Sequence, residues 1–446
     1  MKIIRKANGF VNLFPRHYNQ SDVADVVLSH YTHFERISED KAMLFSFLSD
    51  AIVLLDKDEA DIVENEDFQK NPEFFKQLQK NGFFVNKKDN EFSLMINHRL
   101  SFDSVDTKTL KVVILPTTSC NARCEYCCGV MNVPEDMTME IAQKVVEFVA
   151  NMAKDYERLQ IGWYGGEPLL KKDLITFISD EIRLHLPSIQ FSSYLISNTS
   201  LINNEVIDKM VTSWNVKRIG ITFDGIESEH NCRKNFIDPS INGYSQTLKY
   251  IQPLLDAGIL VQCRFNVDKN NISQLEPLLH ILSPYLNNKL FYFYVAFLKG
   301  QDTDNAIFDK NEYNNLVYEI SKVYKKFDLS TSIDGLLLSV FTKWCQGKSK
   351  NSVTIGPNGT IYKCNLVNLE KPNSIGSIFS GIEKNKNYEE FVNRDIENGC
   401  LRCKFLPICQ GGCPVDEKRK SKSTDKCTEF RYRVNGIARA LADYYS

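Results

Sequence analysis

Cysteine is the residue type whose number and spacing in this chain point most directly to chemistry. The 446 residues include 13 cysteines, and none of them precedes residue 120. Six lie between Cys120 and Cys263, and seven lie between Cys345 and Cys427. In a reducing compartment, cysteines at this density indicate metal ligands rather than a disulfide framework. Each group is therefore a candidate metal-binding region.

The first group begins with the segment CNARCEYCC at residues 120–128. Spacings of three and then two residues let one loop supply three corners of a cubane iron–sulfur cluster, through Cys120, Cys124 and Cys127. The fourth iron then has no protein ligand and is open to chemistry. The alternative is a zinc loop, but zinc sites favour four protein ligands in paired short spacings, and no His lies nearby.

This segment resembles the Cys-x3-Cys-x-aromatic-Cys motif of the radical S-adenosylmethionine (SAM) superfamily, with Tyr126 in the aromatic position. The resemblance implies a [4Fe–4S] cluster on Cys120, Cys124 and Cys127, with SAM bound at the open iron. It also implies the reaction. One electron passes from the reduced cluster to SAM, and the resulting 5′-deoxyadenosyl radical abstracts a hydrogen from an unactivated carbon of the substrate.

Three further segments match the superfamily in the same order, each after a candidate strand. GGEP at 165–168 resembles the Gly-Gly-Glu-Pro motif that holds the amino group of SAM, since glycines allow close approach and a carboxylate pairs with an ammonium. SNT at 197–199 is similar to Thr-Asn-Gly but lacks the glycine. TFDG at 222–225 resembles Ser-Leu-Asp-Gly, whose hydroxyl contacts the carboxylate or ribose of SAM.

His230 and Arg233 follow at about the spacing of the superfamily. A guanidinium pairs bidentately with a carboxylate, so Arg233 is the candidate for the salt bridge to the carboxylate of SAM. His230 is interpreted as a structural hydrogen-bonding residue. The SAM contacts implied by the resemblance are Tyr126, Gly165, Gly166, Glu167, Ser197, Asn198, Thr222, Asp224, Arg233 and Arg264.

The second group of cysteines lies in a segment of weak periodicity, where bound metal is expected to supply part of the stability. Its pattern is Cys345-x13-Gly359-x4-Cys364, Cys400-x2-Cys403-x5-Cys409-x3-Cys413 and then Cys427. The short pairs alone also fit a zinc ribbon. The complete arrangement resembles the SPASM extension of radical SAM enzymes that modify peptides and proteins, which carries two auxiliary [4Fe–4S] clusters.

The SPASM resemblance implies how these seven thiolates are shared. One auxiliary cluster is implied on Cys345, Cys364 and Cys413, and a second on Cys400, Cys403, Cys409 and Cys427. Two cubanes need eight thiolates for full protein ligation, so one iron of the first auxiliary cluster is expected to be open to a substrate thiolate. Of the remaining cysteines, Cys263 on a strand is interpreted as a small buried apolar residue. Cys128 and Cys232 have no assigned role.

The elements that position these residues indicate an α/β fold. Strand candidates alternate with amphipathic stretches, as at 141–152, where Thr138 is a possible N-cap. This pattern predicts a parallel sheet with crossover helices, doubly wound or barrel-like, and we expect a partial (β/α)6 TIM-like barrel over 106–325. The strand candidates are 110–115, 159–164, 191–196, 218–223, 259–265 and 291–297.

Residues 1–105 contain no cysteine and are predicted to form a small α+β, winged-helix-like domain. Helices are predicted at 59–66 and 72–80, and strands at 83–85 and 92–96. Such a domain resembles the element that binds the leader of ribosomally made peptides by strand addition. The alternative is a structural cap without a binding role. The last predicted domain, 326–446, is the iron–sulfur SPASM domain.

Composition excludes several classes of protein. Apolar residues make up 43% of the chain and charged residues 25%, which is typical of globular proteins. With 54 Lys and Arg against 56 Asp and Glu, charge gives no reason to expect nucleic acid or an anionic membrane as partner. The sequence shows neither a signal peptide nor an apolar run of ~18 residues, so we expect a cytoplasmic protein.

These features predict a radical SAM enzyme that acts on a ribosomally made precursor peptide with a leader segment and installs a crosslink, a thioether being favoured. SAM and three [4Fe–4S] clusters are the expected cofactors, and a flavodoxin or ferredoxin is the expected one-electron reductant. Two alternatives remain: a protein oxidase similar to the anaerobic sulfatase maturases, and a non-enzymatic iron–sulfur or zinc protein. The sequence indicates neither the bond that is formed nor a general acid or base.

Overall fold

The computed structural model describes residues 1–7, 23–96, 108–127, 134–298, 308–329, 345–366, 369, 371–415, 427 and 429–446. The chain divides into two compact units. The unit that we call the sheet unit consists of Asp106–Phe308 and Cys345–Arg394. The unit that we call the terminal unit consists of Met1–Val105, Asp309–Trp344 and Asp395–Ser446.

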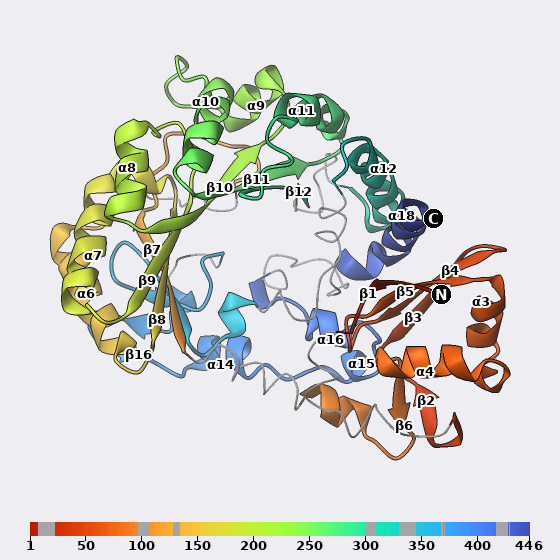
Figure 1. The fold of residues 1–446 in the computed structure, drawn as a ribbon. Helices are drawn as coiled ribbons and strands as arrows, with labels where there is room; N and C mark the ends of the chain where they lie inside the picture. Colours follow the sequence, from red (N-terminus) through yellow and green to blue (C-terminus); the bar gives the residue numbers. More distant parts are fainter. Residues whose placement is uncertain are drawn as a thin grey trace. The chain divides into compact units, whose positions relative to one another are not determined.

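A parallel sheet forms the centre of the sheet unit (Figure 1). Its strands β7 to β12 lie in sequence order, and each pairs in parallel with the next. The predicted strands and the α/β class are confirmed. The strands are β7 (Thr109–Thr117), β8 (Arg158–Gly165), β9 (Gln190–Ile196), β10 (Val216–Phe223), β11 (Leu260–Val267) and β12 (Phe291–Phe297).

Helices follow these strands and pack on one face of the sheet (Figure 1). On β10, Ile219, Ile221 and Phe223 are buried at that face, whereas the alternate residues Gly220 and Thr222 are half-buried on the opposite, inner face. The helices are α6 (Met139–Ala153), α7 (Lys172–His185), α8 (Asn204–Thr212), α9 (Glu227–Lys234), α10 (Gly243–Asp256) and α11 (Leu275–Leu282). The predicted N-cap of α6 is confirmed, since Thr138 accepts a hydrogen bond from the Ile141 amide at 3.2 Å.

A segment from the C-terminal third of the chain extends this sheet. Strand β13 (Ser352–Ile355) pairs in parallel with β7, and β14 (Ile361–Tyr362) pairs antiparallel with β13. All four residues of β13 are buried, which explains why this short strand belongs to the sheet. The strands β15 (Gly376–Ser377) and β16 (Gly381–Ile382) and the helix α14 (Lys386–Val392) complete the unit.

The terminal unit contains an antiparallel sheet in the order β1-β5-β4-β3 and a separate pair, β2 and β6. The strands are β1 (Lys2–Arg5), β2 (Val26–Leu28), β3 (Thr32–Ser38), β4 (Lys41–Ser46), β5 (Ile52–Asp56) and β6 (Phe84–Asn86). The helices are α3 (Lys57–Glu64), α4 (Pro72–Lys80), α12 (Tyr313–Lys326), α15 (Asn398–Leu401), α16 (Leu406–Cys409) and α18 (Val434–Tyr445). The N-terminal part therefore has the predicted α+β composition, and its winged-helix interpretation stays a prediction.

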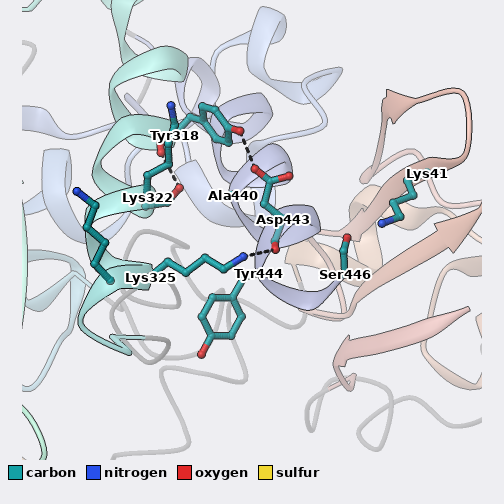
Figure 2. A pocket seen from close by; sticks show the side chains of 10 residues that line it. Lys41, Tyr318, Lys322, Lys325, Ala440, Asp443, Tyr444 and Ser446 are labelled. Carbon is teal, nitrogen blue, oxygen red and sulfur yellow. Dashed lines mark hydrogen bonds between the residues drawn. The ribbon is translucent and has the colours of Figure 1, made fainter.

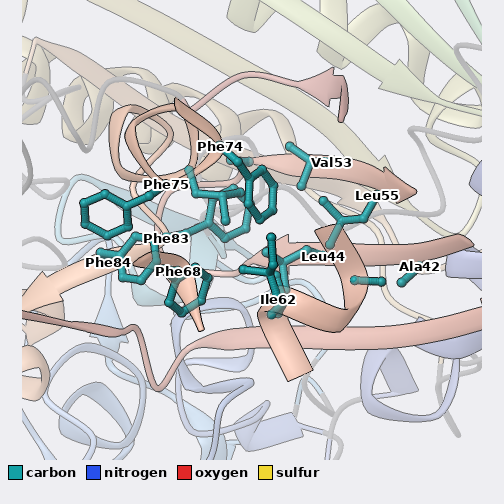
Figure 3. Close-up of a cluster of buried hydrophobic side chains, with 14 of the residues drawn as sticks. Ala42, Leu44, Val53, Leu55, Ile62, Phe68, Phe74, Phe75, Phe83 and Phe84 are labelled. Atoms are coloured by element: carbon teal, nitrogen blue, oxygen red, sulfur yellow. The ribbon is translucent and has the colours of Figure 1, made fainter. Parts of the chain in front are cut away.

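A phenylalanine-rich core holds the N-terminal part of this unit together (Figure 3). The ring of Phe84 on β6 lies 4.8 Å from the ring centroids of both Phe68 and Phe75. Leu44 and Val53 pack into the same cluster from β4 and β5. Burial of this apolar surface is the main stabilising term for so small a layer of helices and strands.

One prediction about the linear organisation is wrong, and the predicted domain bounds, which stay a prediction, do not coincide with the two units. Residues 92–96 were expected to form a strand, but 91–96 are helical. The Asn90 side chain caps this helix by accepting a hydrogen bond from the Ser93 amide at 3.0 Å. The segment 326–446 does not form one compact unit, because 345–394 extends the sheet unit and 395–446 belongs to the terminal unit.

None of the described helices combines the length and the apolar character needed to cross a membrane.

Candidate active site

The cysteine loop follows β7 and is fixed by backbone hydrogen bonds to the end of α9 and the residues that follow it. The Arg123 amide donates to the carbonyl oxygens of Lys234 at 3.1 Å and Asn235 at 2.9 Å. The Ile237 amide donates to the carbonyl of Asn121 at 2.9 Å. These bonds hold the loop at the carboxyl ends of the parallel strands, which is where ligands bind in folds of this kind.

The three predicted cluster ligands of this loop lie close enough to influence one another. Burial raises the pKa of the Cys120 and Cys124 thiols, and the Cys127 thiol raises both further. The Cys127 amide donates to the Cys124 carbonyl at 3.0 Å, which closes the turn between them. Their arrangement fits a cubane in which each thiolate ligates a different iron. Cys128 lies outside the described residues.

Two glycines let the end of β8 approach this loop. A Cβ atom on Gly166 would lie 2.0 Å from the carbonyl oxygen of Ser119, and one on Gly165 would lie 2.1 Å from that of Thr117. Gly165 also has a φ of +133°, a conformation that only glycine adopts without strain. The Glu167 amide then donates to Ser119 at 2.9 Å. The predicted glycine motif therefore forms a tight contact with the cysteine loop.

Glu167 is completely buried and holds the next loop in place. Its Oε1 accepts hydrogen bonds from Ser197 Oγ at 2.9 Å and the Leu169 amide at 3.1 Å, and its Oε2 accepts from the Asn198 amide at 2.7 Å. Burial raises the pKa of Glu167 to about 7, although these three donors act to lower it. Asn198 Nδ2 in turn donates to Asn121 Oδ1 at 2.8 Å. Three predicted site residues, Glu167, Ser197 and Asn198, are thus brought together beside the cysteine loop.

Thr199 occupies the place of the glycine that the third motif lacks. Its φ is +67°, in the left-handed region that β-branched residues rarely adopt. The Thr199 amide donates to Ser197 Oγ at 3.0 Å, and its hydroxyl donates to the Asn198 carbonyl at 2.6 Å. These bonds maintain the conformation that a glycine would adopt freely, so the departure from the motif preserves the backbone path.

A buried ion pair lies directly beneath the aromatic residue of the cysteine loop. Lys234 Nζ lies 3.2 Å from Asp224 Oδ2, and the Tyr126 hydroxyl bridges them, accepting from Lys234 at 2.8 Å and donating to Asp224 at 2.7 Å. Asp224 is inaccessible to solvent and Lys234 is 4% exposed. Asn266 Nδ2 donates to the other carboxylate oxygen of Asp224 at 3.1 Å.

Each member of this ion pair stabilises the charged form of the other. Burial acts to raise the pKa of Asp224, but Lys234 and the Tyr126 hydroxyl outweigh it and hold that pKa below its usual value. Burial acts to lower the pKa of Lys234, but Asp224 and Tyr126 outweigh it and raise that pKa. Both groups are therefore charged near neutral pH. Lys234 is not among the site residues predicted from the sequence, because nothing in the sequence signals that this lysine is buried.

His230 and Arg233 both have structural partners. His230 is buried, and burial followed by the charge of Lys234 lowers its pKa to about 3, so its ring is neutral. Its Nδ1 accepts a hydrogen bond from the Asp224 amide at 3.4 Å, in agreement with a structural role. Arg233 pairs through both arms with Asp268, one at 3.1 Å, and lies 3.5 Å from Glu229. The guanidinium proposed for the SAM carboxylate thus already has a carboxylate partner.

Thr222 and Arg264 lie side by side in the register of β10 and β11. Both are half-buried on the inner face of the sheet. Arg264 Nε is buried without a hydrogen-bond partner in the described part of the chain. Cys263, next to it, points to the opposite face and is fully buried, which fits the prediction of a small apolar residue.

Four of the C-terminal cysteines are brought together in the terminal unit. Burial raises the pKa of Cys400, and the thiols of Cys409, Cys403 and Cys427 raise it further. These are the four predicted ligands of the second auxiliary cluster. Of the other three, Cys345 and Cys364 belong to the sheet unit and Cys413 to the terminal unit.

The cysteines do not form a site for a single metal ion. Within the described ranges, no three His, Cys, Asp or Glu side chains are placed to hold one ion. A cubane does not require such convergence, because each thiolate ligates its own iron.

A pocket of about 550 Å³ in the terminal unit is lined by none of the predicted site residues (Figure 2). It lies along α12 and α18, where the Tyr318 hydroxyl donates to Asp443 at 2.6 Å and Lys325 donates to the Asp443 carbonyl at 2.9 Å. Four lysines line it, so it would favour anions.

Comparison with known proteins agrees with the geometry of the cysteine loop. Residues 114–280 match the model of the Radical SAM superfamily. This region runs from β7 to α11 and contains the cysteine loop together with every predicted SAM contact. A domain of this superfamily implies an enzyme that binds SAM and one [4Fe–4S] cluster.

Two relatives each share 25% sequence identity with part of this chain. An uncharacterized protein of Methanocaldococcus jannaschii is 25% identical over 302 residues, which cover 67% of this chain and 96% of that protein. The pre-heme d1 synthase of Dinoroseobacter shibae is 25% identical over 199 residues, which cover 43% of this chain and 46% of that protein. The chain thus spans about half of the second relative.

Two solved structures share the fold. The structure of anSMEcpe with bound AdoMet and the Cp18Cys peptide has a TM-score of 0.61 at 16% identity, covering 76% of this chain and 100% of that one. The structure of Streptococcus suis SuiB bound to precursor peptide SuiA has a TM-score of 0.53 at 18% identity, covering 91% of this chain and 100% of that one. The chain therefore carries a radical SAM domain within residues 114–280 and shares its fold with anSMEcpe and SuiB.

Proposed function

We propose that this chain is a radical SAM enzyme that abstracts a hydrogen atom from a residue of a ribosomally made precursor peptide and installs a crosslink, with a thioether favoured. The observation that carries the proposal is the cysteine loop after β7, held against the buried Glu167 and Asn198 within the region that matches the superfamily. The donor set fits a [4Fe–4S] cluster on Cys120, Cys124 and Cys127. When bound there, the cluster and SAM would supply a carbon radical.

The residues of the chain itself would orient the cofactor and exclude water. Gly165 and Gly166 let the end of β8 pack against the backbone of the cysteine loop, and the buried Glu167 carboxylate fixes Ser197 and Asn198 beside it. Thr222 and Arg264 would contact the polar end of SAM from the inner face of the sheet. Tyr126, fixed by Lys234 and Asp224, would hold the cysteine loop rigid, so that the open iron keeps one position.

Arg233 would act through Asp268. Both terminal nitrogens of Arg233 are bonded to Asp268 in this structure, so we propose that the pair positions the segment after β11, where Asp268 lies. Asp224, which pairs with Lys234, would likewise support the cysteine loop.

A peptide substrate is supported by three features. The fold is shared with SuiB, which was solved with a precursor peptide, and with anSMEcpe, which was solved with peptides. The C-terminal cysteines are typical of the SPASM extension, and Cys400, Cys403, Cys409 and Cys427 lie within electrostatic reach of one another. Residues 1–105 would bind the leader. We further propose two auxiliary clusters, a cytoplasmic location, and a flavodoxin or ferredoxin as reductant.

The experiment is anaerobic reconstitution followed by reduction with dithionite in the presence of SAM and a Cys-containing peptide encoded beside this gene. We expect 5′-deoxyadenosine and a peptide that has lost the mass of two hydrogens. In tandem mass spectra, fragment ions should be missing between the two linked residues. A colourless protein that cleaves no SAM would contradict the enzyme proposal, and SAM cleavage without peptide change would contradict the peptide proposal.

A protein oxidase similar to the sulfatase maturases is the second candidate, because the TM-score to anSMEcpe is higher than that to SuiB. The same spectra separate the two candidates. Oxidation of a single residue leaves a complete series of fragment ions, whereas a crosslink removes the ions between its ends.

A further inference from the structure

The inner face of the parallel sheet carries cations but no carboxylates. The strands β7 to β12, all of which are described, contain no Asp or Glu. Arg218 and Arg264 are half-buried on this face, as are Tyr194 and Tyr294. The electrostatic potential at this part of the face is therefore positive.

These four side chains form one cluster, which we call the arginine–tyrosine cluster. Arg218 pairs with Tyr194 in the register of β10 and β9, and its guanidinium carbon lies 4.7 Å from the centre of the Tyr194 ring. Arg264 pairs with Tyr294 in the register of β11 and β12. Burial raises the pKa of Tyr294, and both arginines act to lower it, which places both guanidinium groups near its hydroxyl.

A glycine on the neighbouring strand makes room for this cluster. A Cβ atom on Gly162 would lie 2.3 Å from the Tyr194 ring, so any other residue would displace the tyrosine. Tyr194 thus lies between Gly162 and Arg218. The cluster is therefore built by four neighbouring strands, β9 to β12, and does not consist of mobile surface side chains.

Neither arginine has a carboxylate partner of its own. In the portion of the chain described, Arg218 and Arg264 make no ion pair or hydrogen bond, and Arg264 Nε is buried without a partner. Two other buried cations of this unit do have carboxylate partners, Arg233 with Asp268 and Lys234 with Asp224. A half-buried guanidinium without a partner forgoes strong bidentate hydrogen bonds, which a planar carboxylate would supply.

The position of Arg218 separates it from the predicted SAM contacts. It precedes Thr222 on β10 by four residues, which at ~3.3 Å per residue is about 13 Å along the strand. It therefore lies toward the amino-terminal end of the sheet, away from the cysteine loop. A ligand that reaches Arg218 extends well below the end of β10 where the cofactor is expected.

We propose that the arginine–tyrosine cluster binds a carboxylate of the substrate, so that the peptide segment on this face carries an acidic side chain. The inference rests on the proposed function for its peptide substrate. The Arg218 guanidinium donates two parallel hydrogen bonds to the carboxylate, and the Tyr194 and Tyr294 rings lie on either side of that carboxylate with their hydroxyls as further donors. Arg264 adds positive charge between this site and the cofactor. The cluster thus selects which part of a peptide lies on the inner face.

The test is residue-specific labelling of arginines with phenylglyoxal on the cluster-loaded, SAM-saturated enzyme, read by mass spectrometry of the digest. The probes are acetyl-Gly-Gly-Glu-Gly-Gly-amide and its Gln counterpart. We expect the Glu probe to protect Arg218, and the Gln probe to need about tenfold higher concentration for equal protection, because it lacks the charge-assisted hydrogen bonds of a carboxylate. Arg183, which pairs with Asp180 at 2.7 Å on α7, is the control and should label equally with either probe.

Variants separate a binding role from a structural one. In the cluster-loaded enzyme without SAM, where Arg264 is not covered by the cofactor, protection of Arg264 by the Glu probe should be strongest in the wild type, weaker in Arg218→Lys and weakest in Arg218→Gln. A merely structural role would change the labelling of Arg183 as well and would not rank the two variants by charge.

Three results would overturn the inference. The first is equal protection by the Glu and Gln probes. The second is protection by inorganic phosphate as strong as by the Glu probe. The third is full protection of Arg218 by SAM alone with no further effect of the Glu probe, which would assign the cluster to the cofactor. Because labelling needs no turnover, failure of peptide modification with intact Glu protection would refute the proposed function and not this site.

Discussion

Replacing Lys234 with Met removes the cation that faces the buried Asp224. In the wild type, Asp224 is inaccessible to solvent and lies 3.2 Å from Lys234 Nζ. Met has a similar length and no charge, so the variant retains packing and leaves the Asp224 carboxylate with the hydrogen bonds from Asn266 and the Tyr126 hydroxyl. An uncompensated buried carboxylate is strongly destabilising.

The expected loss is about 3–5 kcal/mol, the usual effect of removing one partner from a buried ion pair. For a unit of this size, ~1 kcal/mol corresponds to roughly 2–4 °C in melting temperature, so we expect a fall of about 6–20 °C. The assay is anaerobic calorimetry of the holoprotein at neutral pH. Lys144→Met is the control, because Lys144 pairs with Glu147 at the surface, where such pairs contribute little.

The loss should depend on pH in a defined direction. In the wild type the pKa of Asp224 is lowered in the folded state, so its contribution is present above its unfolded pKa and is lost as pH falls through the folded pKa. In Lys234→Met, burial without the cation raises that pKa, so the carboxylate is favourable only when protonated at lower pH. The difference between variant and wild type should therefore grow from pH 5.5 to pH 8.

A second substitution tests the cause directly. The double variant Lys234→Met/Asp224→Asn replaces the ion pair with two neutral groups and should recover most of the melting temperature. If Lys234→Met melts within about 2 °C of the Lys144→Met control, or if the double variant is less stable than the single one, the electrostatic account of this pair is wrong.

Three other perturbations test separate parts of the structure. Gly166→Ala should lose the iron and visible absorption of the SAM cluster, because the new Cβ would lie 2.0 Å from the Ser119 carbonyl oxygen. The control Gly399→Ala, where no atom lies within 4 Å of the new Cβ, should retain both. Equal iron contents in the two variants would show that the contact between Gly166 and Ser119 does not hold the cysteine loop. Cys400→Ala and Cys409→Ala should each lose the iron of one auxiliary cluster, whereas the control Cys232→Ala, at an exposed cysteine, should keep the full iron content. Full iron content in Cys400→Ala or Cys409→Ala would refute the role of that cysteine as a ligand. Phe84→Ala should destabilise the terminal unit by about 3–5 kcal/mol in calorimetry, while Phe379→Ala, 65% exposed, should change little; similar effects of both would show that the aromatic cluster is not the core.

The parallel sheet was predictable because its strands are long and regular. The strands β9, β10 and β12 alternate buried residues with less buried ones. Side-chain caps mark the starts of the helices α6, α8 and α10. The ends of parallel strands share one edge, so the cysteine loop, the glycine motif and Asp224 could be assigned to the same region. The extension of the sheet by β13 was not predictable, because four residues give too short a pattern.

The partners of the site residues could not be predicted from the sequence. Arg233 meets Asp268 from a loop after another strand, and Lys234 meets Asp224 and Tyr126 only when α9 and the cysteine loop are folded together. Burial changes the chemistry of these groups, and burial of a single Lys or Arg has no local sequence signature. The left-handed conformation of Thr199 is similarly set by its contacts with Ser197 and Asn198.

The helix at 91–96 shows how a short apolar run can mislead. The run 92–96 has strand-like composition, but Asn90 caps a helix and Glu91 is anchored by Ser29 and by the His30 amide at 3.0 Å. The contacts of Glu91 come from residues distant in the chain, which local composition does not reveal.

The most direct test of the central claim is the amount of 5′-deoxyadenosine formed from SAM after dithionite reduction of the anaerobically reconstituted protein, measured beside the mass of the precursor peptide. The account predicts 5′-deoxyadenosine together with a peptide lighter by two hydrogens, and the loss of both in Cys120→Ala, Cys124→Ala and Cys127→Ala. Equal SAM cleavage in the wild type and in these three variants would contradict it.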